Sequence, residues 1–154
     1  MAIDLSTAGI HLKYAVEATA GSRPTSSYID LAGVKSIPDF NPEPSMLETT
    51  TLNETTYRTY IPGLKDMGDA KAFRFNFTDA FSSLWASLMS AYASAASSNK
   101  ATWFEVVIPG ITKAFYFAGQ PSPLGLSAID VDSVLEIDAY ITPTSEPIWE
   151  AKST

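Results

Sequence analysis

The side chains best suited to chemistry are the carboxylates near the end of the chain. If segment 130–139 is an extended strand, its acids lie on one face and its apolar residues on the other. The acidic face holds Asp130, Asp132, Glu136 and Asp138. Neighbours on such a face lie about 6.6 Å apart, which suits a glycosidase carboxylate pair but is met by any acidic strand. No glycine-punctuated loop favours calcium, so an electrostatic role and an ordinary solvated sheet face stay open.

Other catalytic and metal-binding signals are scarce. The chain has one histidine, His11, and no cysteine. These counts exclude a multi-histidine metal site, disulfides, thiolate nucleophiles and cysteine-ligated metals. The signatures G-x-S-x-G, H-E-x-x-H and the Walker loop are not found. We therefore expect no enzymatic activity, no cofactor and no metal, with His11 at a partly exposed strand position.

The composition is that of one globular domain spanning residues 1–154. The chain is 45% hydrophobic and 18% charged, with a formal net charge of -7. Such an acidic chain lacks the cationic surface that grips a phosphate backbone, which argues against a DNA-gripping module. Residues 1–21 lack the apolar run of a secretory signal, and no segment is long and apolar enough to span a bilayer. We expect neither export nor membrane insertion.

Hydrophobic periodicity predicts a mainly β fold with one helix. Alternating, aromatic or β-branched segments predict strands over 10–16, 28–37, 57–61, 71–77, 102–108, 112–118 and 131–139. Pro109 and Gly110 predict a hairpin turn between two of them. This order favours an antiparallel β-sandwich or barrel with a flanking α-helix.

The helix is predicted over residues 79–97. Phe81, Trp85 and Leu88 recur on one face, and Thr78 or Asp79 offers an N-cap. The opposite face is uncharged, whereas a freely solvated helix face normally carries Lys and Glu. It includes Ser83, Ser87, Ser90, Ala91 and Ser94. This face either contacts another surface or belongs to a small-residue surface helix that touches nothing.

Residues 38–57 have no clear period. Three prolines and four acids, with no basic residue, lie between Pro38 and Thr56. Compact domains rarely contain a structureless loop of about 20 residues unless it has a function or is disordered. This segment is therefore a candidate functional loop.

Four stretches carry a resemblance to a known family. They are 33–39 (GVKSIPD), 42–44 (PEP), 47–52 (LETTTL) and 60–66 (YIPGLKD). With these motifs the chain resembles the major tail tube proteins of bacteriophages with long, non-contractile tails. The resemblance covers most of the chain and includes no catalytic motif. It implies the tail-tube fold in a single domain, without the C-terminal immunoglobulin-like domain that some relatives add.

The resemblance implies a structural virion protein. Six subunits would form a ring, rings would stack into the hollow tail tube, and viral DNA would pass through without specific binding. Assembly would take place in the cytoplasm of the host bacterium. The implied partners are further copies of the chain, a tape-measure protein, the tail terminator, tail tip proteins and assembly chaperones.

On this hypothesis three surfaces acquire roles. The loop 38–57 would order against an adjacent ring through Asp39, Phe40, Glu43, Met46, Leu47, Glu48, Leu52 and Glu54. The uncharged helix face would contact a neighbouring subunit, since buried Lys or Glu would have to be desolvated there. The four acids of segment 130–139 would line the bore, because a negative wall repels phosphates.

The main alternative is a monomeric or small-oligomer β-sandwich module that binds a carbohydrate or a host-surface ligand. Such modules usually expose aromatic platforms on loops. Between Pro38 and Thr56 the only aromatic residue is Phe40. This favours assembly over ligand capture, and an enzyme is the third interpretation.

Overall fold

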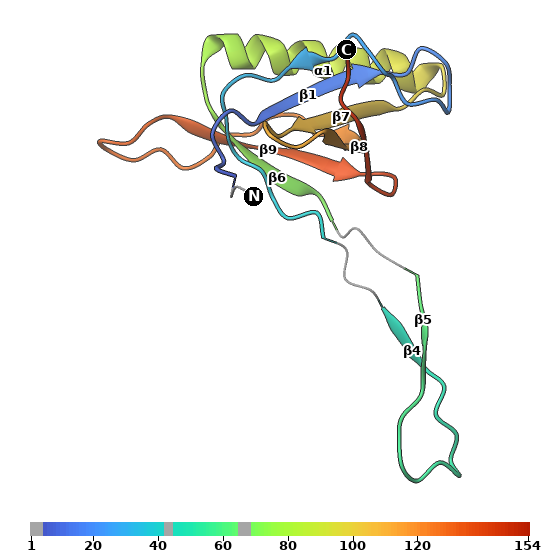
Figure 1. The fold of residues 1–154 in the computed structure, drawn as a ribbon. Helices are drawn as coiled ribbons and strands as arrows, with labels where there is room; N and C mark the ends of the chain where they lie inside the picture. Colours follow the sequence, from blue (N-terminus) through green and yellow to red (C-terminus); the bar gives the residue numbers. More distant parts are fainter. Residues whose placement is uncertain (1–4, 42–44, 65–68) are drawn as a thin grey trace. The chain divides into compact units, whose positions relative to one another are not determined.

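The computed structural model describes residues 5–41, 45–64 and 69–154, and the chain divides into two compact units (Figure 1). The larger, here called the core unit, comprises Met1–Pro38 and Ala70–Thr154. The smaller, called the hairpin unit, comprises Asp39–Asp69. The hairpin unit thus contains most of the segment that the sequence marks as a candidate functional loop.

The core unit is an antiparallel sheet with one helix. Its strands follow the order β2-β1-β7-β8-β9-β6-β3, and β10 joins the path by pairing with β8. The elements are β1 His11–Val16, β2 Ile29–Asp30, β3 Val34–Ser36, β6 Lys71–Asn76, α1 Asp79–Ser97, β7 Thr102–Val107, β8 Lys113–Pro121, β9 Glu136–Pro143 and β10 Ile148–Ala151. The predicted fold class, mainly β and antiparallel with a flanking helix, is confirmed.

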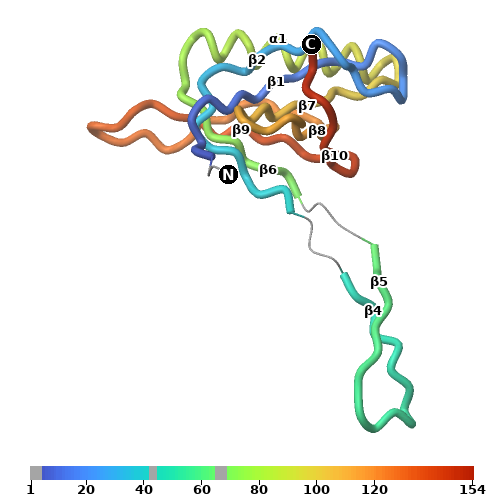
Figure 2. Tube along the Cα trace, in the orientation of Figure 1, coloured from blue at the N-terminus to red at the C-terminus, as the bar shows by residue number. Residues whose placement is uncertain are grey.

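Strand β8 joins the two halves of the sheet. Its first half pairs with β10, and its last residues pair with β9, as the trace in Figure 2 shows. Gly119 lies where β8 meets β9, and a Cβ atom there would lie 2.7 Å from Ile141 Cγ2. A larger residue would push the strands apart, so glycine permits this close approach.

Aromatic packing between α1 and the sheet forms much of the core. The Thr78 hydroxyl caps the helix by accepting a hydrogen bond from the Phe81 amide at 3.1 Å. Phe81 then stacks on Phe75 of β6, with ring centroids 4.5 Å apart, and Trp85 is likewise buried. Fully burying such a side chain stabilises the fold by roughly 1.5–3 kcal/mol. Across the described residues, no helix combines the length and apolarity needed to cross a bilayer.

The hairpin unit consists of β4 Met46–Glu48 paired with β5 Tyr60–Pro62. Thr49 donates its amide to the Thr59 carbonyl at 2.7 Å, which extends the ladder towards the turn. None of the described residues of this unit is buried. The prediction of a structureless loop over 38–57 is therefore wrong at β4. Three residues are too few to show a period, and the pairing with β5 defines the strand.

Candidate assembly surfaces

The four predicted bore-lining acids do not share one strand face, which corrects the sequence interpretation. Strand β9 starts at Glu136, and Asp130 and Asp132 lie in the preceding segment, here called the 122–135 loop. Asp132 has φ 56°, the left-handed conformation that a short polar side chain tolerates. Val131, expected on a buried strand face, is 88% exposed. The alternation of acidic and apolar residues is typical of a strand, but the chain forms no strand over residues 130–135.

Glu136 and Asp138 do lie on one face of β9, but cations neutralise them. Glu136 binds Lys35 Nζ at 2.6 Å and Arg74 Nη1 at 2.7 Å, and Arg74 Nε lies 3.4 Å from Asp138. The strand register places Arg74 of β6 opposite Asp138. Hydrogen bonds from Lys35 and then Arg74 lower the pKa of Glu136. A glycosidase acid needs a raised pKa, so Glu136 is poorly suited to that chemistry.

A hollow of about 580 Å³ lies between the 122–135 loop and the outer face of β9. Folding of the loop brings Asp130 to this hollow beside Glu136 and Asp138, whereas Asp132 is not among its lining residues. The Ser127 hydroxyl accepts a hydrogen bond from the Asp138 amide at 3.0 Å and ties the loop to the strand. Three of the four predicted acids, Asp130, Glu136 and Asp138, thus line the same hollow. No three His, Asp or Glu side chains among the described residues form a group able to hold a metal ion.

The predicted uncharged helix face lies at the surface of α1. Ser83, Ser87, Ser90 and Ser94 are exposed, and Ala91 is half-buried. Ala91 and Ser94 also line a shallow hollow of about 330 Å³. After Asp79 the helix carries no charged residue. The geometry permits close approach by another surface, and the assignment of this face to a neighbouring subunit stays a prediction.

Two buried glutamates, Glu17 and Glu105, hold separate chain segments together through hydrogen bonds that were not predicted from the sequence. Burial acts to raise the pKa of Glu17, but hydrogen bonds from the Ala101 amide, the Trp103 indole and the Gly21 amide outweigh it and lower the pKa. Glu105 is fully buried. It accepts hydrogen bonds from the Tyr116 hydroxyl at 2.6 Å and from the Ser153 amide and hydroxyl at 3.0 and 2.7 Å. Glu105 therefore anchors the C-terminal segment.

Exposed apolar side chains gather in two segments. In the hairpin unit they are Met46, Leu47, Leu52, Tyr57, Tyr60, Ile61 and Leu64. In the 122–135 loop, the orange finger of Figure 2, they are Leu126, Ile129, Val131, Val134 and Leu135. Of the residues predicted for the inter-ring loop, Met46, Leu47 and Leu52 belong to the first group, and Glu43 lies outside the described residues. Sequence reasoning missed the second group, although apolar residues without a period in a Pro, Gly and Ser segment are a usable signal.

A third exposed apolar feature lies at the C-terminal strand. Trp149 of β10 packs edge to face on Phe115 of β8, yet its side chain is 48% exposed. Strand β10 was not predicted from the sequence, because it has only four residues. Pro147 followed by Ile148 and Trp149 was the available signal, because proline often precedes an edge strand.

No protein-family model and no curated protein matches the chain. The fold nevertheless has a counterpart among solved structures. A chain in the cryo-EM structure of the anti-feeding prophage (AFP) baseplate, 6-fold symmetrised, matches with a TM-score of 0.68 at 8% sequence identity. The match covers 98% of this chain and 98% of that chain. The two chains share a fold. The similarity therefore extends beyond the core sheet to nearly the whole length of both chains.

Proposed function

We propose that this chain is a structural subunit of a phage tail-type particle and assembles with copies of itself into stacked six-membered rings. The observation that carries the proposal is the concentration of exposed apolar side chains in the hairpin unit and the 122–135 loop, beside a closely packed core. Large exposed apolar patches usually mark interaction sites. The shared fold with a chain of a 6-fold symmetrised prophage baseplate supports a particle of this kind.

The two apolar segments differ in sequence and in structure, so each offers a different surface for contact with another copy. Contacts between unlike surfaces generate rings when the rotation closes and filaments when it does not. An isolated two-stranded hairpin is also marginally stable in water, so contact with another copy would stabilise the hairpin unit.

We further propose that the rings enclose a bore through which DNA passes without specific binding. The net charge of -7 disfavours retention of phosphate. Lys35 and Arg74 neutralise Glu136 and Asp138, so within the described ranges the acids of the predicted bore-lining set without an ion pair are Asp130 and Asp132.

Thiol labelling tests the proposed bore. The chain has no cysteine, so Asp132→Cys would introduce a single thiol. In intact tubes this thiol should resist a bulky maleimide that cannot enter the bore, whereas it should react rapidly in dissociated subunits. Equal reaction in both states would contradict the bore-facing placement.

The proposed setting is the tail of a virion, assembled in the host cytoplasm. The proposed partners are a tape-measure protein, the terminator, tip proteins and chaperones, and no catalytic role is assigned. A monomeric binding module is the second candidate, favoured by the exposed ring of Trp149. Negative-stain microscopy of concentrated purified protein separates the two. Rings or hollow tubes support assembly, and uniform small particles support the binding module.

A further inference from the structure

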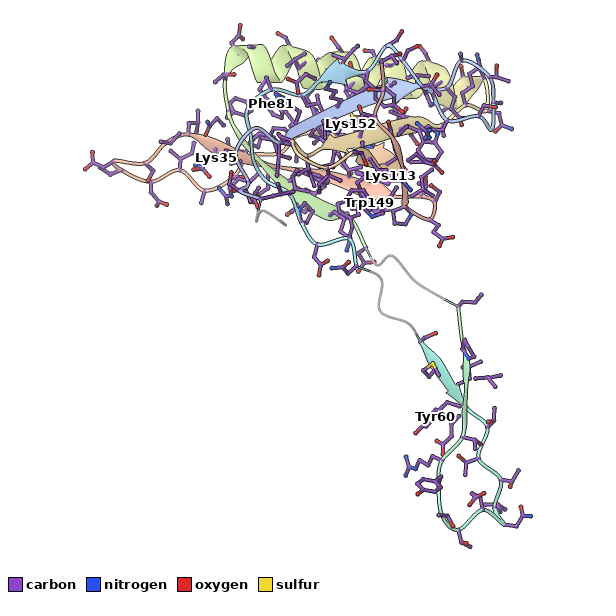
Figure 3. The ribbon with its side chains drawn as sticks, viewed as in Figure 1. Lys35, Tyr60, Phe81, Lys113, Trp149 and Lys152 are labelled. Atoms are coloured by element: carbon purple, nitrogen blue, oxygen red, sulfur yellow. The ribbon has the colours of Figure 1, made fainter. Side chains whose placement is uncertain are left out.

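The first half of β8 has an aromatic edge that one short strand covers. Residues 113–118 read Lys-Ala-Phe-Tyr-Phe-Ala, with no proline and a single charge. On one side β8 pairs with β7, and on the other side residues 113–116 pair with β10, while the pairing with β9 begins only at Gly119. Figure 3 shows Lys113 of β8 and Trp149 of β10 at the same end of the core unit. Without β10, residues 113–116 would form an unpaired edge of high β propensity, which is a template for pairing with another chain.

Strand β10 is itself a poor template for further pairing. It has only four residues, it follows Pro147, and its third residue is Glu150. Natural sheets blunt their exposed edges with short strands, proline and charged side chains. Addition of β10 therefore replaces an aromatic edge with a short and charged one.

The attachment of β10 through its own residues is small. Four residue pairs join it to β8, and three of its four residues are exposed. Trp149 adds a ring contact with Phe115, with 5.2 Å between the ring centroids. Segments with few buried contacts open locally at a low cost in free energy. The strand therefore depends on contacts made beyond its own end.

A buried cluster next to the end of β10 supplies those contacts. The Glu105 carboxyl group accepts hydrogen bonds from the Ser153 amide at 3.0 Å and the Ser153 hydroxyl at 2.7 Å. The Tyr116 hydroxyl lies between the Glu105 carboxyl group, at 2.6 Å, and the Ala151 carbonyl, at 2.7 Å. Glu105 is fully buried, so loss of these donors would leave a desolvated polar group with fewer partners. We call Glu105, Tyr116 and Ser153 the anchor cluster.

The anchor cluster also contacts residues 22–28, the segment that precedes β2. The guanidinium carbon of Arg23 lies 4.1 Å from the centroid of the Tyr116 ring, and the centroid of the Tyr28 ring lies 5.9 Å from it. The Thr154 amide donates a hydrogen bond to the Thr25 carbonyl at 3.1 Å. The end of the chain is therefore held by contacts that do not involve the edge of β8.

We propose that residues 147–154 act as a strap that covers the aromatic edge of β8 and is locked by the anchor cluster. While the strap is closed, residues 113–116 cannot pair with another chain, and association is left to the hairpin unit and the 122–135 loop. When the strap opens, the edge of β8 pairs with the same edge of a second copy and leads to β-rich aggregates. The strap is a property of the single chain, so it does not require the proposed rings.

Hydrogen exchange on the full chain tests the lock. In the wild type, the amides of residues 148–151 should exchange through opening of the strap, faster than the buried amides of β6. Ser153→Ala removes one donor to Glu105 and keeps the backbone amide, so it should raise exchange at residues 148–151 by roughly tenfold. Ser97→Ala is the matched control, because the Ser97 hydroxyl donates to the Ser94 carbonyl at 2.7 Å, outside the strap.

A second variant reaches the lock from β8. Tyr116→Phe removes the hydroxyl between Glu105 and Ala151 and keeps the ring, so it should also raise exchange at residues 148–151. Exchange of these amides only through global unfolding, at the rate of β6, would overturn the strap. An unchanged rate in Ser153→Ala, or the same rise in Ser97→Ala, would overturn the lock.

Aggregation tests the edge itself. Below their melting transitions, Ser153→Ala and Tyr116→Phe should form thioflavin T-positive aggregates several times faster than the wild type and Ser97→Ala. In these aggregates the amides of residues 113–116 should be protected from exchange. Equal aggregation rates, or free exchange of residues 113–116 in the aggregates, would contradict the role of the edge. Absence of rings or tubes from the wild type would count against the proposed function and leave the strap intact.

Discussion

The core unit and the hairpin unit use apolar residues in opposite ways. In the core unit Phe73, Phe75, Phe104 and Phe117 are fully buried, whereas none of the described residues of the hairpin unit is buried. Core burial provides the free energy that stabilises the fold. On the proposed function, the exposed apolar residues of the hairpin unit stabilise contact with another copy instead. The comparison thus distinguishes residues that are buried on folding from residues that are proposed for assembly.

The largest expected effect on folding comes from the aromatic core. Trp85→Ala should lower the free energy of unfolding by about 3–5 kcal/mol, since it removes a buried ring and leaves the Ser122 carbonyl without the indole donor seen at 3.0 Å. Urea denaturation followed by circular dichroism measures the change. Tyr57→Ala, in the hairpin unit, should alter the same quantity by less than about 0.5 kcal/mol. A comparable loss from both variants would break the distinction between the two units.

A smaller, pH-dependent effect is expected at Glu17. Its pKa is lowered in the folded state, so its stabilisation is present above the unfolded value of 4.5 and is lost as the pH falls through the folded value. Glu17→Gln should cost about 1–3 kcal/mol at pH 7, because buried donors lose a charged acceptor. The wild type should therefore lose its advantage over the variant as the pH is lowered from 7 to below 4.5. A constant difference across that range would contradict the account.

Helix capping should contribute less. Thr78→Ala removes the side-chain acceptor of the Phe81 amide and should lower the free energy of unfolding by about 1 kcal/mol. Thr78→Ser keeps the hydroxyl and serves as the control, with most of the stability retained. If both substitutions cost the same, the capping hydrogen bond is not the source of the effect.

The smallest effect on folding should follow removal of the whole hairpin. Ser36 of β3 pairs with Arg74 of β6, so the chain leaves and re-enters the core unit on neighbouring strands. A short Gly-Ser linker in place of residues 40–68 can join them, and the melting temperature of the core unit should change little. Self-association should be lost. Normal tubes from this variant would refute the role of the hairpin in assembly.

Strong local periodicity made much of the core unit predictable from sequence. The helix was predicted over 79–97 and observed over the same residues, because Phe81, Trp85 and Leu88 mark its buried face and Thr78 its start. The hairpin of β7 and β8 likewise follows from two apolar segments around Pro109 and Gly110. The local sequence, through its periodicity and its turn and cap residues, therefore specifies these elements.

The candidate assembly surfaces were only partly predictable, since they depend on distant residues. Glu136 lies 101 residues from Lys35, and no local pattern shows that the two form an ion pair. Asp130 and Asp132 alternate with apolar residues as a strand would, but tertiary pairing begins only at Glu136. The exposure of Trp149 depends on which strands pair with β8. Those pairings join residues that lie far apart in the sequence, so no local pattern shows them.

Sedimentation velocity over a wide range of protein concentrations tests the central claim most directly. The account predicts that the weight-average sedimentation coefficient rises steadily from micromolar to millimolar concentration, passes beyond that of a dimer, and stays at the monomer value when the hairpin is replaced. A single monomeric species at every concentration, or a plateau at the dimer, would contradict repeated contact between unlike surfaces.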